Sequence, residues 1–235
     1  MAAGAAAGAD VREFCCSSPS AVMVTVWPTA FSQKDAVRQW LSDCGAEIKH
    51  ESEIRLTQRA GVPACLALYF GEDWLHSNCW YTESPLPEGP PEGPYAGAKW
   101  KAALTFRDST PDPMAVFVVD AAATDGELWH TKYRVREKLR KAVGALGNAC
   151  IHVTDDQTAA LGAWRRDDSG SDGGGGYSCD SSYAFHCARV LLEPSSVAFL
   201  NGADIHSRDF DEQFERFAAW LSSPPGSPDA EQPFI

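Results

Sequence analysis

Hydrophobic and polar positions along the chain predict strands and helices in a mixed order. Apolar, β-branched runs predict strands at 21–27 and 114–122, and a shorter run predicts another at 148–153. Residues 46–56 alternate between apolar and polar positions, which is typical of a half-exposed strand. Because helical segments separate these strands, we expect an α+β fold.

Helical periodicity is clearest at 130–144, where Val135, Leu139 and Val143 recur every four residues and Gly144 follows as a stop. The same periodicity predicts four more helices, at 32–45, 154–166, 183–193 and 209–223. Two further apolar segments have no decisive period, namely 61–80 and 99–106.

Glycine and proline mark the boundaries of the predicted domain. Residues 83–97 are a proline-rich loop, and 167–182 are a glycine-rich surface insertion. Residues 1–20 and 224–235 are expected to be disordered tails. A single α+β domain over 21–223 remains, for which we expect a mostly antiparallel sheet with helices on one face and extra C-terminal helices.

Composition and charge argue against several classes of protein. The 235 residues are 44% hydrophobic, so the chain can bury a sizeable core. The net charge of −12 argues against nucleic-acid or membrane-surface partners, because both are polyanions. No apolar run approaches the roughly 20 residues of a membrane span, and the start "MAAGAAAGADVREF" lacks the features of a secretory signal. We therefore expect a cytoplasmic protein whose eight cysteines are reduced.

A basic cluster interrupts this acidic chain on the helix predicted at 130–144. Six of the 20 lysines and arginines fall between residues 132 and 141. Arg136 and Arg140 lie one turn apart on one face of that helix, and the planar guanidinium group suits phosphate oxygens. A solvated helix face is the alternative explanation of the cluster.

His152 stands at the end of the strand predicted at 148–153, between the basic helix and a helix expected to begin at Thr154 or Asp155. A helix N-terminus favours an anion nearby, and a neutral imidazole held there can attack phosphorus and become a covalent phospho-carrier. Surrounding cations would stabilise the transition state. A buried structural histidine is the alternative explanation.

The stretch "NACIHVTD" resembles the strand-end motif N-x-x-H-G-S-D of the nucleoside-diphosphate kinase family. Asn148, His152, Thr154 and Asp155 supply the matching residue types. Asn148 is one position further from the histidine than in the motif, and Val153 stands in place of its glycine.

Two other segments are similar to that family. "RKAVG" supplies Arg140 and Gly144 for an arginine that stands four residues before a glycine, and the loop that follows is reduced to "ALG". "VTVWPTAF" is similar to a first strand that leads into K-P-D, with Trp27 in place of the lysine. Tyr69 is the candidate for the tyrosine of the family's lid helix.

The resemblance spans residues 21–57 and 114–166, and continues more weakly to 193. It implies a ferredoxin-like βαββαβ sandwich and a phosphotransferase that binds ATP or another nucleotide or phosphorylated small molecule, uses Mg²⁺ and self-associates. His152 would then be the catalytic phospho-acceptor and Asp155 would orient its ring. The residues expected to bind phosphate are Arg140, Arg136, Asn148 and Thr154.

Two other functions stay open. A catalytically inactive domain of the same fold, binding a nucleotide or another protein, would suit Trp27 and the short loop. A metal-dependent hydrolase would use histidines and aspartates, although the chain has no H-x-H, H-E-x-x-H or D-x-D cluster. Its candidate ligands are His130, His152, Asp120 and Asp155.

Overall fold

The computed structural model describes residues 11, 13–69, 91–106, 112–124, 127–144, 149–154 and 183–223. A four-stranded sheet with strand order β2-β3-β1-β4 lies at the centre of these residues, and every neighbouring pair of strands is antiparallel. Its strands are β1 (Ala21–Val26), β2 (Glu47–Leu56), β3 (Asp112–Asp120) and β4 (Ile151–Val153). The expected α+β class is therefore confirmed.

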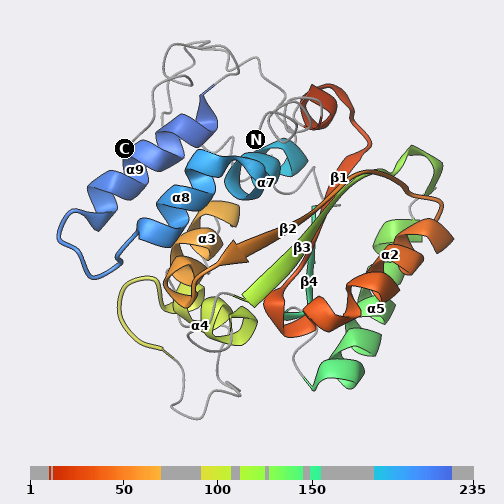
Figure 1. Cartoon of the computed structure of the whole chain (residues 1–235), viewed down its shortest axis with the longest axis horizontal. Coiled ribbons are helices and arrows are strands. Elements are labelled where there is room, and N and C mark those ends of the chain that lie inside the picture. Colours follow the sequence, from red (N-terminus) through yellow and green to blue (C-terminus); the bar gives the residue numbers. More distant parts are fainter. Residues whose placement is uncertain are drawn as a thin grey trace, which may run out of the picture.

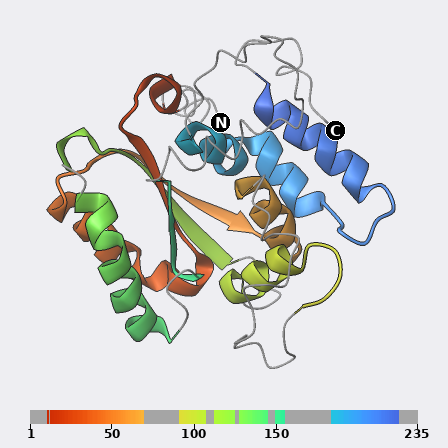
Figure 2. The same ribbon diagram turned by 180° about the vertical axis from the view of Figure 1, so that it is seen from behind.

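Helices cover both faces of the sheet, as Figure 1 shows and as the view from behind in Figure 2 confirms. One face carries α2 (Lys34–Asp43) and α5 (Glu127–Val143). The other face carries α3 (Gly61–Leu68), α4 (Ala96–Thr105), α7 (Tyr183–Leu192), α8 (Pro194–Gly202) and α9 (Phe210–Ser222). The expectation that helices cover only one face is thus corrected, because α3 and α4 join the C-terminal helices in a second layer.

The alternation of side chains along β1 explains why two layers are needed. Val22, Val24 and Val26 pack into the core on the side of α2 and α5, whereas Met23 and Trp27 pack into the core on the opposite side. Successive side chains of a strand point to opposite faces. A central strand that is buried at every position must therefore be covered on both faces.

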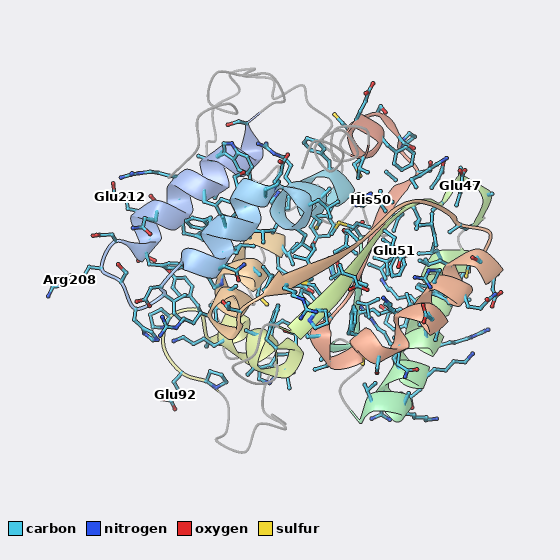
Figure 3. All side chains as sticks on the ribbon, in the orientation of Figure 1. Glu47, His50, Glu51, Glu92, Arg208 and Glu212 are labelled. Atoms are coloured by element: carbon cyan, nitrogen blue, oxygen red, sulfur yellow. The ribbon has the colours of Figure 1, made fainter. Side chains whose placement is uncertain are left out.

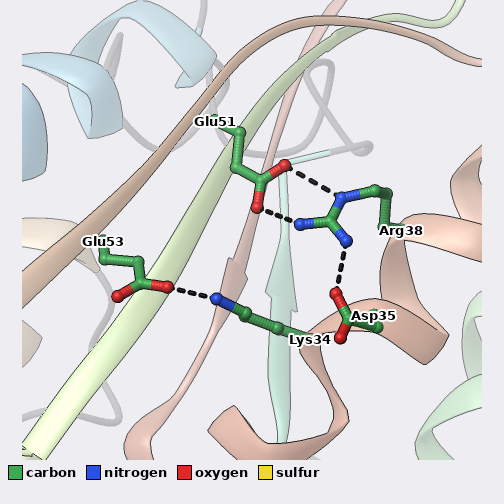
Figure 4. A network of polar contacts seen from close by, with 5 residues as sticks. All are labelled: Lys34, Asp35, Arg38, Glu51 and Glu53. Atoms are coloured by element: carbon green, nitrogen blue, oxygen red, sulfur yellow. Dashed lines mark hydrogen bonds and ion pairs between the residues drawn. The ribbon is translucent and has the colours of Figure 1, made fainter.

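Many charged side chains lie at the outside of these layers. Figure 3 shows this for Glu92, Arg208 and Glu212. On the edge strand β2, Glu51 and Glu53 form ion pairs with Arg38 and Lys34 of α2 (Figure 4). Charge on an edge strand disfavours pairing with a strand of another molecule.

A buried arginine joins α7 to α9. Arg189 donates hydrogen bonds from Nη1 to the carbonyl oxygens of Leu221 (2.8 Å) and Ser223 (2.7 Å). Its guanidinium also lies over the ring of Trp220, 4.2 Å from the centroid. Carbonyl groups at a helix C-terminus lack partners within the helix, so Arg189 satisfies two of them and fixes α9 on the core.

Part of the expected N-terminal tail is ordered. Residues 13–17 are helical, and Val11 and Cys15 are buried in the core on the side of α3 and α7. The expectation of a disordered tail is therefore corrected for residues 13–20. Val11 and Cys15 are one helical turn apart, so both can pack against the core, and Phe14 and Cys16 pack beside them.

The expected loop at 83–97 ends before its predicted boundary, because α4 begins at Ala96. The helix expected at 154–166, the glycine-rich insertion at 167–182 and the tail at 224–235 lie wholly or almost wholly outside the described residues. Among the helices that the structure describes, none has the length and apolar character needed to cross a bilayer.

Candidate functional site around His152

β4 positions His152 on the face of the sheet that carries α3, α4 and α7. Ile151 and Val153 pack into the core beneath α2 and α5, so the residue between them faces the opposite way. His152 pairs across the ladder with Thr25 of β1. Only 7% of its surface is exposed.

Two tyrosines hold the imidazole ring. The hydroxyl of Tyr69, just after α3, lies 3.2 Å from Nδ1 of His152, and the hydroxyl of Tyr183 in α7 lies 3.2 Å from Nε2. Tyr183 also donates a hydrogen bond to the carbonyl oxygen of Leu68 (2.8 Å). Both ring nitrogens are therefore fixed by groups from distant parts of the chain.

These contacts determine which nitrogen of His152 carries the proton. A tyrosine hydroxyl has one hydrogen, and that of Tyr183 is donated to Leu68. The oxygen of Tyr183 must then accept a hydrogen bond from Nε2–H of His152. In the neutral ring the lone pair lies on Nδ1, where the hydroxyl of Tyr69 donates to it.

The charges of three cations act on this ring. Burial lowers the pKa of His152 well below its ordinary value, and the positive charges of Lys101, Arg136 and Lys132 lower it further. The imidazole is therefore neutral at pH 7. Burial also lowers the pKa of Lys101 to about 8, and the charge of Arg136 acts in the same direction.

Lys101 reaches the site from α4. Its Nζ atom lies 5.6 Å from the ring centroid of Trp27 and 5.8 Å from that of Tyr69. These are cation–π distances. A lysine from α4 thus lies beside the ring of Trp27.

Several buried hydrogen-bond donors of the cluster lack an acceptor. Within the described part of the chain, Thr25 Oγ1, Trp27 Nε1 and Arg136 Nε have no hydrogen-bond partner. The side chains of Thr25 and Trp27 are fully buried. A buried donor without a partner costs free energy, so this set of atoms suits a ligand with oxygen acceptors.

Comparisons with protein-family models, curated proteins and solved structures find no match to this chain. The site is therefore interpreted from its own residues.

Arg140 is not brought to His152, which corrects the expected pairing of these two residues. Its side chain is half exposed, and its Nε atom donates to Glu137 at 2.9 Å. Arg136, one turn earlier on α5, instead donates from Nη2 to the carbonyl oxygen of Ile151 at 3.4 Å. The helix contacts β4 at Arg136. Arg140 lies one turn further along the same face, where its side chain is half exposed.

Thr154 has a structural contact in place of the expected phosphate contact. Its hydroxyl accepts a hydrogen bond from the backbone N–H of Met23 (2.8 Å), and its own N–H donates to the carbonyl oxygen of Met23 (3.0 Å). Thr154 thereby extends the pairing of β4 with β1. Asn148 and Asp155, the other two expected residues of the motif, lie outside the described residues.

The ligands expected for a hydrolase are dispersed where they are described. His130 is exposed on α5, and Asp120 accepts hydrogen bonds from Ser20 (2.6 Å) and the N–H of Ala122 (3.0 Å) at the end of β3. No group of three or more histidines, cysteines, aspartates or glutamates suited to a metal occurs in the described ranges. The described residues around His152 are cationic and phenolic, so they do not fit a protein-held Mg²⁺ ion.

Sequence reasoning missed Lys101, Tyr183 and the part played by Lys132 in the cluster. Lys101 lies in a segment without clear periodicity, and Tyr183 opens a helix whose pattern indicates packing only. Tyr69 is the residue of this contact set that the sequence had offered as a candidate.

Proposed function

We propose that the cluster around His152 binds a phosphorylated small molecule, such as a nucleotide, and that Nδ1 of His152 accepts a phosphoryl group from it. The observation that carries this proposal is a neutral imidazole with its lone pair on Nδ1 in a cluster with Lys101, Lys132 and Arg136. Cations attract and orient phosphate oxygens, and a neutral ring nitrogen is the nucleophile that phosphoryl transfer requires.

The arrangement of strands and helices supports a ferredoxin-like core. The order β2-β3-β1-β4 with antiparallel neighbours, and α2 and α5 on one face, are what a βαββαβ chain of that kind would give. In this core His152 would sit on the edge strand, where α5 can bring cations beside it.

The transfer step follows from the tautomer. The lone pair of Nδ1 forms a bond to the terminal phosphorus, and the bond from phosphorus to the leaving oxygen breaks with its electron pair on that oxygen. Nε2 keeps its proton and its hydrogen bond to Tyr183. The hydroxyl of Tyr69, which donates to Nδ1, must turn away for the attack and can then donate to a phosphate oxygen.

The cations and the free donors would share the charge of the phosphate. Lys101 and Arg136 would contact its oxygens in a buried setting, where such contacts are stronger than in water. Trp27 Nε1 and Thr25 Oγ1 would gain the acceptors that they lack within the described residues. Mg²⁺ remains an expectation tied to the polyphosphate, and no step above depends on it.

Labelling with ATP that carries a radioactive terminal phosphate tests this proposal. Wild-type protein should acquire an acid-labile label, and His152→Gln should acquire none while keeping its circular dichroism spectrum. His130→Gln, at an exposed histidine of α5, is the matched control and should label like wild type. Undiminished labelling of His152→Gln would sink the assignment of the acceptor.

A second candidate function is binding of the same ligand without transfer. It is favoured by the 7% exposure of His152 and by the tyrosine contacts at both of its ring nitrogens. Under this alternative, calorimetry would detect nucleotide binding that Arg136→Met weakens, yet no label would accumulate on the wild-type protein.

A further inference from the structure

Tyr133 of α5 stands out among the described residues, because it is a large hydrophobic side chain that is 59% exposed. Its ring contacts two cations. Nζ of Lys132 lies 5.4 Å from the ring centroid, and Cζ of Arg136 lies 5.7 Å from it. Neither contact removes the ring from solvent.

The same two cations belong to the cluster around His152. Lys132 and Arg136 both lower the pKa of His152, and Arg136 donates to the carbonyl oxygen of Ile151, the residue before it. Tyr133 is therefore an exposed ring in contact with two cations whose charge acts on the imidazole. A ligand whose phosphates lie against Arg136 and Lys132 would have its organic part beside this ring.

We propose that Tyr133 is a specificity-determining residue whose ring stacks against a planar aromatic group of the phosphorylated ligand, as a nucleobase would provide. This inference rests on the proposed function, since it takes the phosphate site for granted. Stacking on an aromatic face accepts any base, so Tyr133 would select for a planar ring and would not distinguish one base from another. The hydroxyl group of Tyr133 is not required.

The test compares two ligands that share a phosphate chain. Isothermal titration calorimetry of the full chain with ATP and with inorganic tripolyphosphate separates the contribution of the base from that of the phosphates. Tyr133→Ala should weaken ATP binding by roughly 5- to 100-fold and leave tripolyphosphate binding unchanged. Tyr133→Phe should bind both ligands like wild type. Lys138→Ala, at an exposed position of the same helix, is the control for altered surface charge.

The outcomes separate this inference from the proposed function. If tripolyphosphate binds and Arg136→Met weakens it, but Tyr133→Ala binds ATP like wild type, the stacking role is wrong and the phosphate site stands. If GTP and CTP bind far more weakly than ATP to the wild-type protein, selection by stacking alone is also wrong. If neither ATP nor tripolyphosphate binds, the proposed function fails and this inference fails with it.

Discussion

Replacing Lys101 by methionine should stabilise the protein at neutral pH. Lys101 is buried on α4, and burial lowers its pKa from the ordinary 10.5 to about 8. The unfolded chain therefore keeps this proton up to pH 10.5, whereas the folded chain releases it near pH 8. Between these two values the free energy of unfolding rises with pH, and below pH 8 the buried charge is a full cost to the folded state.

The size of this effect follows from the two pKa values. Each pH unit between them is worth about 1.4 kcal/mol, so the charge of Lys101 costs about 3 kcal/mol at pH 7. Methionine keeps the length and the apolar stem of the side chain without the charge. We expect Lys101→Met to raise the free energy of unfolding at pH 7 by about 1–3 kcal/mol, since some of the gain is lost to imperfect packing.

Urea denaturation at pH 7.5 and at pH 9.5 measures the change. Wild-type protein should gain stability between these pH values, and Lys101→Met should be more stable at pH 7.5 and show a smaller gain. Lys99→Met, at a half-buried position of the same helix, is the matched control and should keep the wild-type dependence on pH. A less stable Lys101→Met protein with an unchanged pH dependence would refute the reasoning, because contacts of the ammonium group would then outweigh the cost of its burial.

Three further predictions concern the rest of the fold. Burial lowers the pKa of His186 from 6.5 to about 4. The free energy of unfolding should therefore be highest above pH 6.5 and fall by about 3 kcal/mol as the pH is lowered to 4. Urea denaturation of His186→Phe should show a smaller fall. Gly61→Ala places a Cβ atom 2.9 Å from Cδ2 of Phe106, and thermal unfolding should show a loss of about 1–3 kcal/mol in the free energy of unfolding. Gly202→Ala is the control: no atom lies within 4 Å of its added carbon, so it should not lower the free energy of unfolding. Arg38→Met removes the ion pair to Glu51 of β2 and should change the free energy of unfolding by less than about 1 kcal/mol, with a difference from wild type that shrinks further in 1 M salt.

The fold could be predicted from the sequence where one local period dominates. The sequence predicted β1 and β3 from their apolar, β-branched runs. It predicted α5 and α9 because their apolar residues recur about every 3.6 positions. α4 was missed, since its residues are buried on most sides and so show no single apolar face. The packing of helices on both faces of the sheet depends on contacts between segments that are far apart in the sequence. A short stretch of sequence carries no information about such contacts.

The candidate site could be predicted only at His152 itself. Helical spacing puts Arg136 and Arg140 on one face of α5 and cannot choose between them. The choice depends on where α5 meets β4, and the contact of Arg136 with the carbonyl oxygen of Ile151 marks that place. Lys101 and Tyr183 enter the site from segments far away in the sequence, so only the tertiary structure reveals them.

The free-energy cost of burying the cations around His152 indicates whether they serve packing or ligand binding. A cluster kept for packing alone would be expected to lose nothing by becoming apolar, because buried charges are more often a cost than a gain. A cluster that receives an anion recovers that cost on binding, since the anion compensates the buried charge of Lys101, favours its protonated form and satisfies the donors of Trp27 and Arg136. Binding at pH 8.5 should then draw a proton from the buffer, and its calorimetric heat should change with the ionisation enthalpy of that buffer in the wild-type protein and not in Lys101→Met. An equal dependence on the buffer in both proteins would place the proton elsewhere and would remove Lys101 from the binding site.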